Sequence, residues 1–318
     1  YHFLEDIIGV RWWSPWEEFV PELPAKYACK ILDYSGKPGI PMRSLNTYNL
    51  YHTTEGKEKL WAPRNRINTE MHTSIPVEFG GSLDYGGPSF VHTEGWYYRK
   101  LNEKGLLKKE WVAKRNGKRI IHEKGKALEI YQLCFSNLDL RKALTVTFLE
   151  NIEENLKKKN PPTIFDFSFN DISSRCECED CNKLAEKYGG TDTGLMLEFL
   201  NELAEEVKEK YPHVLLSTLA YMNTEPIPEG IKPHENLIIT LCDTVSSYTS
   251  PLSTESKFVQ LLEKWSEISA KVKIWDYHSC FAYYGLPMPF ESTFQPDIQL
   301  LKKNRVFGVM TEFHQPIF

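Results

Sequence analysis

The sequence lacks the signatures of several common protein classes. No run of about 18 apolar residues is present, so no segment is predicted to span a membrane. The chain has no Walker-type phosphate loop, no GxGxxG and no GxSxG motif, so nucleotide binding and serine hydrolase chemistry have no support. Its nine histidines show no HExxH or other metal-ligand spacing. Carboxylates, aromatic rings and cysteines are left as the groups that can carry a function.

Strong charge of one sign is also missing. The 38 basic and 43 acidic residues are interspersed along the chain and give a formal net charge of -5. Such a chain has no basic face that would attract a polyanion, so we do not expect nucleic acid as a partner. Aromatic residues, in contrast, make up 13% of the chain. Flat aromatic faces stack on sugar rings, although a large core also buries many of them.

The chain is expected to hold one large domain and the remnant of another. Its 318 residues, 41% of them hydrophobic, can bury one core, and a barrel of roughly 250 residues is of normal size. The chain begins at Tyr1 rather than at a methionine and ends at Phe318 directly after an apolar run, so we expect both ends to be cuts. Residues 1–30 are expected to be the last helix and strand of a preceding small α/β domain, and residues 31–318 the main domain, truncated after its last strand.

Strand-like and helix-like patterns alternate from about residue 40 onward. Amphipathic spacing predicts helices over Arg141–Lys158, Thr193–Lys210 and Ser256–Ala270. Alternating strands and helices are typical of a parallel sheet with crossover helices, and eight strands are enough to close a (β/α)₈ TIM barrel. The expected strands are Met42–Leu50, Leu60–Thr69, Tyr131–Asn137, Ile164–Asp171, Leu215–Tyr221, Asn236–Asp243, Lys273–His278 and Gly308–Phe313.

One long segment, Asn68–Ile130, breaks this rhythm. It is rich in glycine, aromatic residues and basic residues, as in GGSLDYGG, HTEGWYYRK and EWVAKRNGKR. Insertions of this length after a strand of such a fold usually carry function. We therefore expect the segment to contribute to the active site.

The active site of such a barrel lies at the C-terminal ends of its strands, so polar residues that end an apolar strand are the first candidates. Asn170 and Asp171 end the fourth expected strand, and Glu312 ends the eighth. Two carboxyl groups that face one cavity suit glycosidic cleavage, with side chains about 5 to 10 Å apart. We expect Asp171 and Glu312 to be the catalytic pair. The alternative is that such carboxylates only solvate the mouth of the barrel.

Other residues near the strand ends are candidates for binding a substrate. For Asp276, alternation along the strand leaves open that the side chain points outward at a helix. Asp166 lies in opposite phase to Asp171 and is expected to face a helix or a buried partner. His92 is expected to be a structural histidine. The candidate binding residues are Tyr221, Asp276, His278, Arg43, Asn46 and Trp275, with Asp243 ending a further strand.

Three of the seven cysteines form the motif C-E-C-E-D-C directly after the fourth expected strand. The spacing of Cys176, Cys178 and Cys181 brings three sulfurs within reach of one metal, and Cys134 would complete a tetrahedral structural zinc site. A disulfide, or reduced thiols that only pack, are the alternatives. A metal or disulfide would brace the loop, and no cofactor is required for the chemistry. Cys29, Cys242 and Cys280 are expected to be isolated and buried.

Seven segments occur in an order that resembles a known family. They are FLEDIIGVRWWSP, RNRIN, YQLCFSN, FSFNDISSRCECEDC, LAYMNTEPIP, IWDYHSCFAYYGLPMP and GVMTEF, and they resemble glycoside hydrolase family 163, a bacterial family formerly described as of unknown function. The resemblance implies an exported endo-β-N-acetylglucosaminidase that acts on the N-glycans of glycoproteins and uses the substrate's 2-acetamido group as nucleophile. It implies that Asn170 or Asp171 orients the acetamide and that Asp171 or Glu312 protonates the leaving oxygen.

Two other functions remain open. An α-glucuronidase-like exo-enzyme would bind a uronate carboxylate through Arg43, Arg64 and Arg66, since guanidinium groups bind carboxylates bidentately. A non-catalytic glycan-binding protein would keep the barrel without the chemistry. Mass analysis of glycans released from an N-glycoprotein separates these functions.

Overall fold

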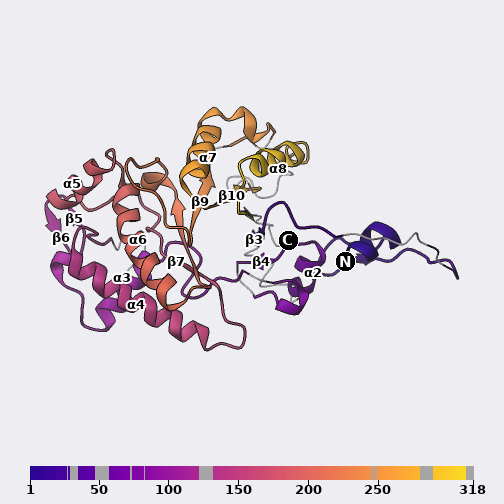
Figure 1. Ribbon diagram of the computed structural model, residues 1–318, viewed down its shortest axis with the longest axis horizontal. Coiled ribbons are helices and arrows are strands. Elements are labelled where there is room, and N and C mark those ends of the chain that lie inside the picture. The colour runs from indigo at the N-terminus through magenta and orange to yellow at the C-terminus, as the bar shows by residue number, and fades with distance from the viewer. Residues whose placement is uncertain are drawn as a thin grey trace.

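A curled parallel sheet forms the centre of the molecule (Figure 1). The computed structural model describes residues 1–26, 28, 35–46, 57–71, 74–81, 83–121, 132–244, 246–247, 249–279 and 289–312. Within these residues seven strands pair in the order β4-β3-β11-β10-β9-β8-β7, with every pair parallel. The strands are β3 (Met42–Asn46), β4 (Thr69–Glu70), β7 (Ile164–Asp166), β8 (Leu215–Ala220), β9 (Leu237–Asp243), β10 (Lys271–Tyr277) and β11 (Gly308–Glu312).

The expectation of a closed eight-stranded barrel is wrong. Among the described residues no ladder joins β4 to β7, so the sheet is open and curled. Most of the expected second strand is instead the helix α2 (Glu58–Arg64), which leaves only the two residues of β4. Pro63 lies inside that segment, and proline cannot donate the ladder hydrogen bond that a central strand requires.

The expected third strand is also wrong. In its described part, residues 132–137, Leu133 forms a single antiparallel bridge with Val112. The segment is short because Asn137 caps the next helix, its Oδ1 accepting from the backbone N–H of Leu140. Beside β7, where a third strand would lie, Tyr85 forms one isolated parallel bridge with Ile164.

Helices lie against the outer face of the sheet (Figure 1). The three expected helices are confirmed as α4, α6 and α7. Both α6 and α7 contact strand β9, while α4 and α5 contact α6. No helix among the described residues combines the length and the apolar character needed to cross a membrane. The helices after α2 are α3 (Glu94–Glu103), α4 (Leu138–Leu156), α5 (Glu179–Lys187), α6 (Asp192–Lys210), α7 (Ser256–Ile268) and α8 (Phe294–Lys303).

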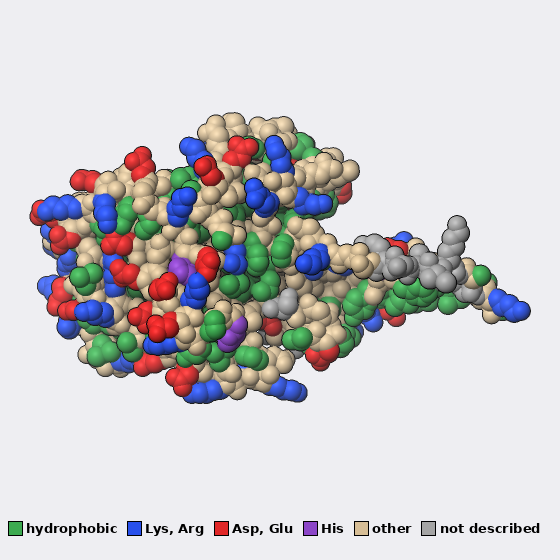
Figure 2. Space-filling view, in the orientation of Figure 1, with side chains coloured by type: hydrophobic (Ala, Val, Ile, Leu, Met, Phe, Trp, Pro, Cys, Tyr) green, Lys and Arg blue, Asp and Glu red, His purple; other side chains and the backbone are tan. Residues whose placement is uncertain are grey.

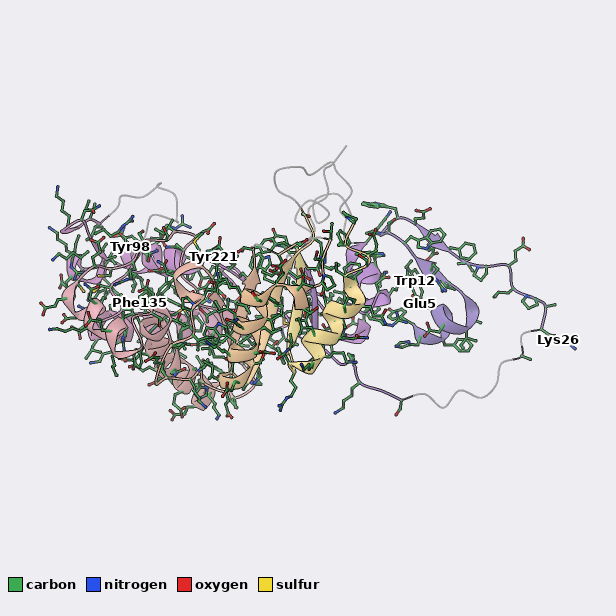
Figure 3. All side chains as sticks on the ribbon, turned by 90° about the horizontal axis from the view of Figure 1, so that it is seen from above. Glu5, Trp12, Lys26, Tyr98, Phe135 and Tyr221 are labelled. Atoms are coloured by element: carbon green, nitrogen blue, oxygen red, sulfur yellow. The ribbon has the colours of Figure 1, made fainter. Side chains whose placement is uncertain are left out.

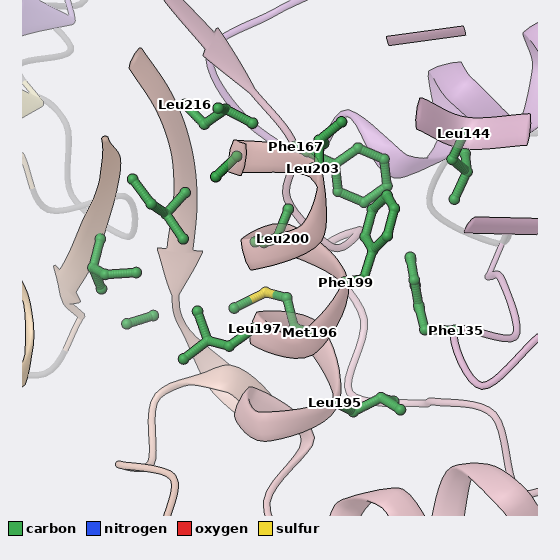
Figure 4. Close-up of a cluster of buried hydrophobic side chains, with 14 of the residues drawn as sticks. Phe135, Leu144, Phe167, Leu195, Met196, Leu197, Phe199, Leu200, Leu203 and Leu216 are labelled. Carbon is green, nitrogen blue, oxygen red and sulfur yellow. The ribbon is translucent and has the colours of Figure 1, made fainter. Parts of the chain in front are cut away.

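The larger hydrophobic core lies between the sheet and the helices and centres on α6 (Figure 4). This helix directs Leu197 toward β8 and Phe199 toward the aromatic residues Phe135 and Phe167. The ring of Phe199 lies 5.5 Å from that of Phe135 and 5.2 Å from that of Phe167, measured between centroids. Because α6 is covered on both sides, apolar residues occupy most of its circumference rather than one stripe.

The inner face of the curled sheet carries a smaller apolar cluster that includes Met42, Ile238 and Met310. Polar groups are buried beside it. Lys273 is 1% exposed and donates from Nζ to the hydroxyl of Tyr85 at 2.7 Å. A buried cation needs such a partner because desolvation otherwise opposes its charge. The inside of the curl is thus packed and partly polar.

The N-terminal residues form an arm that projects from the sheet (Figure 3, with Lys26 near its tip). It contains the short π-helix η1 (Phe3–Ile8) and a two-stranded antiparallel hairpin of β1 (Arg11–Trp12) and β2 (Glu18–Phe19). The indole N–H of Trp61 in α2 donates to the carbonyl of Trp12 at 2.9 Å. Hydrophobic side chains gather along this arm, while acidic and basic side chains mix over the visible face of the main body (Figure 2).

A second hairpin, within the long insertion, joins β5 (Lys114–Arg115) to β6 (Lys118–Arg119). Asn116 and Gly117 form its turn, both with positive φ. An Asn-Gly pair favours this turn because both residues tolerate the left-handed region. The hairpin lies outside the central sheet.

We predict that Phe199→Ala lowers the free energy of unfolding by about 3 to 5 kcal/mol, because it leaves a cavity in a closely packed aromatic core. Urea denaturation followed by circular dichroism measures the change. The matched control is Phe3→Ala, since Phe3 is 51% exposed, and a change below about 0.5 kcal/mol is expected for it. Equal losses from the two variants would contradict the assignment of the core.

Candidate functional site

Residues at the C-terminal ends of β3, β10 and β11 gather on the inner face of the sheet. Glu312 on β11 pairs in register with Asn46 on β3 and with Tyr277 on β10. Side chains of in-register residues on parallel neighbours share one face, so these three groups lie side by side. The strand register therefore brings together residues that are far apart in the sequence.

Glu312 is held in a fixed position by an aromatic neighbour. Its side chain is buried, and its Oε2 accepts a hydrogen bond from the indole N–H of Trp275 at 2.6 Å. The Trp275 ring stacks on Tyr277, with centroids 5.9 Å apart and planes inclined by 21°. On its other side it contacts Phe90 from the long insertion, at 5.8 Å. The carboxyl group thus lies against an aromatic wall, to which the insertion contributes as expected.

Asp171 lies on the loop that follows β7 and is exposed. Its carboxylate bonds the hydroxyl of Tyr221, the residue directly after β8. Burial and this carboxylate together raise the pKa of Tyr221 to about 12. The His92 ring lies 6.2 Å from that of Tyr221, and its Nδ1 is 2.7 Å from the carbonyl of Phe169. The His92 ring is thus anchored to the backbone of the loop after β7.

The two carboxyl groups that we expect to be catalytic both influence the pKa of one phenol, that of Tyr277. Burial raises the pKa of Tyr277, and the charges of Glu312 and Asp171 both add to the shift. Both carboxyls therefore lie within electrostatic range of Tyr277, and this phenol keeps its proton at neutral pH. It can donate a hydrogen bond but cannot act as a base.

Asn170 is engaged elsewhere. Its side chain is buried, and its Oδ1 accepts from the backbone N–H of Gly95, at the start of α3. The same region holds Glu94, a fully buried carboxyl that accepts from the backbone N–H of Leu133 at 2.7 Å and from that of Asn170. Burial raises the pKa of Glu94 to about 8. Both side chains hold the loop after β7 against α3, and no sequence pattern indicates Glu94.

Arg43 does not reach this site. Its guanidinium donates to the backbone carbonyls of Ile40, Pro41 and Arg66, so it lies toward the N-terminal end of β3. Nε and Nη1 of Arg43 are thus bound to the backbone, and the structure does not bring Arg43 together with the other candidate binding residues. The other two arginines of the uronate hypothesis bind the N-terminal arm instead, Arg64 at Glu18 and Arg66 at Glu5.

A cavity of about 240 Å³ opens beside the same strand ends. Tyr221 and Tyr277 line it, and Tyr277 is the register partner of Glu312. Asp243 and Asp276 are register partners on β9 and β10, and both line the cavity on the sheet face that carries the helices. Asp276 therefore points outward, the orientation that strand alternation left open.

The carboxyl groups of this cavity are unusually basic. Burial, with the charges of Asp243 and Asp297 nearby, raises the pKa of Asp276 to about 7. Burial also raises the pKa of Asp243 to about 6 and lowers the pKa of His278 to about 4. The Nε2 of His278 lies 3.6 Å from Oδ2 of Asp276, and its buried Nδ1 has no hydrogen-bond partner among the residues that the structure describes. Sequence analysis missed Asp297, because it lies in α8, outside any strand end.

Asp166 has buried partners, as its phase on the strand predicts. Its carboxylate accepts from the hydroxyls of Ser168 at 2.6 Å, Ser217 at 2.8 Å and Thr93 at 3.2 Å. Burial raises its pKa to about 7 despite these bonds. The group holds β7, β8 and the start of α3 together and does not reach the strand ends.

The cysteines of the CxCxxC motif meet Cys134 in one buried cluster. Cys242 is buried on β9 apart from this cluster, as expected. Two further predictions, for Cys29 and Cys280, lie outside the described residues.

We predict that Asp276→Asn stabilises the protein at pH 8 by roughly 1 to 3 kcal/mol but has little effect near pH 4. With its pKa raised from 3.8 to about 7 in the folded state, this carboxyl favours folding below pH 4, and that contribution is lost as the pH rises through about 7. Urea unfolding between pH 4 and pH 8 measures the difference. The exposed Glu263→Gln is the control, and a pH-independent effect of Asp276→Asn would contradict the assignment.

Comparison with known proteins gives one family. The profile of a family described as a domain of unknown function (DUF4838) matches residues 12–316. A search of curated proteins finds no match to the chain. Because the matched span covers nearly the whole sequence, the chain belongs to the DUF4838 family.

Proposed function

We propose that the protein is a glycoside hydrolase. The observation that carries the proposal is the position of Glu312, buried against the Trp275 indole at the C-terminal edge of a parallel sheet. Asp171 lies on the loop after β7, and both carboxyl groups are within electrostatic range of Tyr277. Glycosidic cleavage uses a proton donor at the leaving oxygen and a second group that stabilises the charge developing on the sugar. We assign the first role to Glu312 and the second to Asp171.

The finer proposal is an endo-β-N-acetylglucosaminidase acting on the N-glycans of glycoproteins, and it rests on the sequence resemblance to glycoside hydrolase family 163. In this proposal the substrate's own acetamido group is the nucleophile. Oδ1 of Asn170 is bound to the backbone of Gly95, so orienting the acetamide falls to Asp171 and to the hydroxyl of Tyr221. Glu312 is then the general acid.

The aromatic residues fit a sugar ring as the ligand. Tyr221 and Tyr277 are half-buried and line the cavity beside Glu312, so each offers part of a flat face to a bound molecule. Asp243 and Asp276 in the same cavity hold raised pKa values and can bind sugar hydroxyls as donors or acceptors. We place one sugar of the substrate in this cavity.

The α-glucuronidase-like alternative has less support. A uronate requires a guanidinium at the site, and Arg43, Arg64 and Arg66 are bound to backbone carbonyls or to the N-terminal arm. A non-catalytic glycan-binding protein keeps the aromatic cleft and the carboxyls without turnover. The activity assay below separates it from an enzyme.

We predict that Glu312→Gln and Asp171→Asn each lower the rate of glycan release by about 10²- to 10⁴-fold, because each removes a group that acts in the transition state. The assay is digestion of a complex N-glycoprotein, with the released glycans analysed by mass. A product that ends in a single reducing N-acetylglucosamine is expected from the unmodified protein. Circular dichroism and thermal melting check that both variants fold.

The control is Glu263→Gln, which changes an exposed carboxyl on α7 and is expected to keep the full rate. Near-normal rates for both site variants would refute the assignment of the chemistry to Glu312 and Asp171. Glycan binding without any release by the unmodified protein would identify a binding protein instead.

A further inference from the structure

The side chains of four cysteines form a buried cluster on the outer side of the fold. All sulfur atoms of Cys134, Cys176, Cys178 and Cys181 lie within 4.8 Å of one another. Each of these residues is at most 7% exposed. A thiol group can pack as a small apolar residue, but here Cys134 meets three cysteines of the CxCxxC motif, which lies on a separate stretch of the chain.

The distances between the sulfurs fit a metal better than a covalent bond. Sγ of Cys134 lies 3.6 Å from Sγ of Cys178 and 3.8 Å from Sγ of Cys181. In a tetrahedral zinc site with Zn–S bonds of about 2.3 Å, neighbouring sulfurs are about 3.8 Å apart. A disulfide requires about 2.05 Å. These two distances match a tetrahedral site, and all four sulfurs lie close enough together to reach one ion.

The N-terminal turn of α5 brings two of these sulfurs close together. Cys178 is the N-cap of α5, and Cys181 is the third residue of that helix. Side chains at these two positions lie next to each other, as they do in a capping box. The helix N-terminus also favours negative charge, which thiolate ligands carry.

Donors surround the cluster on the remaining sides. The backbone N–H of Lys114 donates to Sγ of Cys176 at 3.3 Å, and the guanidinium of Arg119 approaches the same sulfur at 3.9 Å. The hydroxyl of Ser136 lies 3.4 Å from Sγ of Cys134. Four thiolates around Zn²⁺ carry a net charge of about -2, and N–H donors and a cation stabilise such a charge. These contacts are those expected around a thiolate site.

A path for the ion is also present. A cavity of about 420 Å³ reaches Cys134 and Cys178, and Glu110, Asp139 and Asp180 line it. Acidic groups along a cavity raise the local concentration of cations. A metal ion can therefore reach the sulfurs without unfolding of the core.

We propose that Cys134, Cys176, Cys178 and Cys181 bind one Zn²⁺ as a structural tetrathiolate site. With four protein ligands no coordination position is left for a substrate or a water, so the metal takes no part in catalysis. It joins three segments, the β5–β6 hairpin through Lys114 and Arg119, the stretch before α4, and the loop that follows β7. This loop carries Asp171, so the metal fixes the position of that residue.

The test starts with the full chain, purified without metal-affinity steps in reducing buffer, and its metal content measured by mass spectrometry. About one zinc per chain is expected, released in step with modification of four thiols by a mercurial reagent. Replacement by Co²⁺ is expected to give the visible absorption bands of a tetrahedral cobalt thiolate. Removal of the metal by a strong chelator is expected to lower the melting temperature by about 5 °C or more.

The matched variants are Cys178→Ser and Cys242→Ser. Cys242 is buried on β9 outside the cluster, so its variant is expected to keep the full zinc content, whereas Cys178→Ser is expected to lose zinc binding. Metal content of the unmodified chain decides the question even where Cys178→Ser fails to fold. Iron in place of zinc, a disulfide among the four cysteines, or four free thiols with no metal would each overturn the proposal. None of these readouts depends on enzymatic activity.

Discussion

Side chains alternate between the two faces of the sheet along β10, and this alternation determines on which face each candidate residue lies. Trp275 and Tyr277 point to the inner face and meet Glu312, while Asp276 points to the helices and meets Asp243. Strand β10 therefore contributes side chains to both groups of candidate residues, one on each face of the sheet. Because the strands are parallel, their C-terminal ends coincide, and the two sets of groups adjoin through Tyr277.

The second constraint is the fixed position of the loop that follows β7, because Asp171 lies on that loop and depends on it for its own position. Asn170 accepts a hydrogen bond from the backbone at the start of α3. Glu94, the first residue of α3, accepts from the backbone N–H groups of Leu133 and Asn170. The cysteine cluster ties the far end of the same loop to the β5–β6 hairpin. The long insertion thus supports the site from outside, and it also contributes Phe90 to the aromatic wall.

Much of the fold could be predicted from the sequence, and the failures have physical causes. The helices α4, α6 and α7 and the strands from β7 to β11 follow from long periodic patterns. The predictions of the second and third strands are wrong because a short apolar run does not distinguish a strand from a helix. In the second segment Pro63 favours the helix. Glu312 and Trp275 were found at a strand end, whereas Asp297 and Glu94 depend on packing between elements, which periodicity does not reveal. The position of the Arg43 side chain could not be predicted, because alternation along a strand does not show toward which end of the strand a long side chain extends.

The buried carboxyls also show where stability and function conflict. Burial raises the pKa values of Asp243 and Asp276, nearby carboxylates add to both shifts, and at neutral pH this arrangement opposes folding. Replacement by apolar or amide side chains would relieve the repulsion. Asp166, in contrast, is buried with three hydroxyl donors that satisfy it. Asp243 and Asp276 instead line a cavity together with Asp297. This is the arrangement expected when carboxyl groups with raised pKa values face a ligand rather than the core.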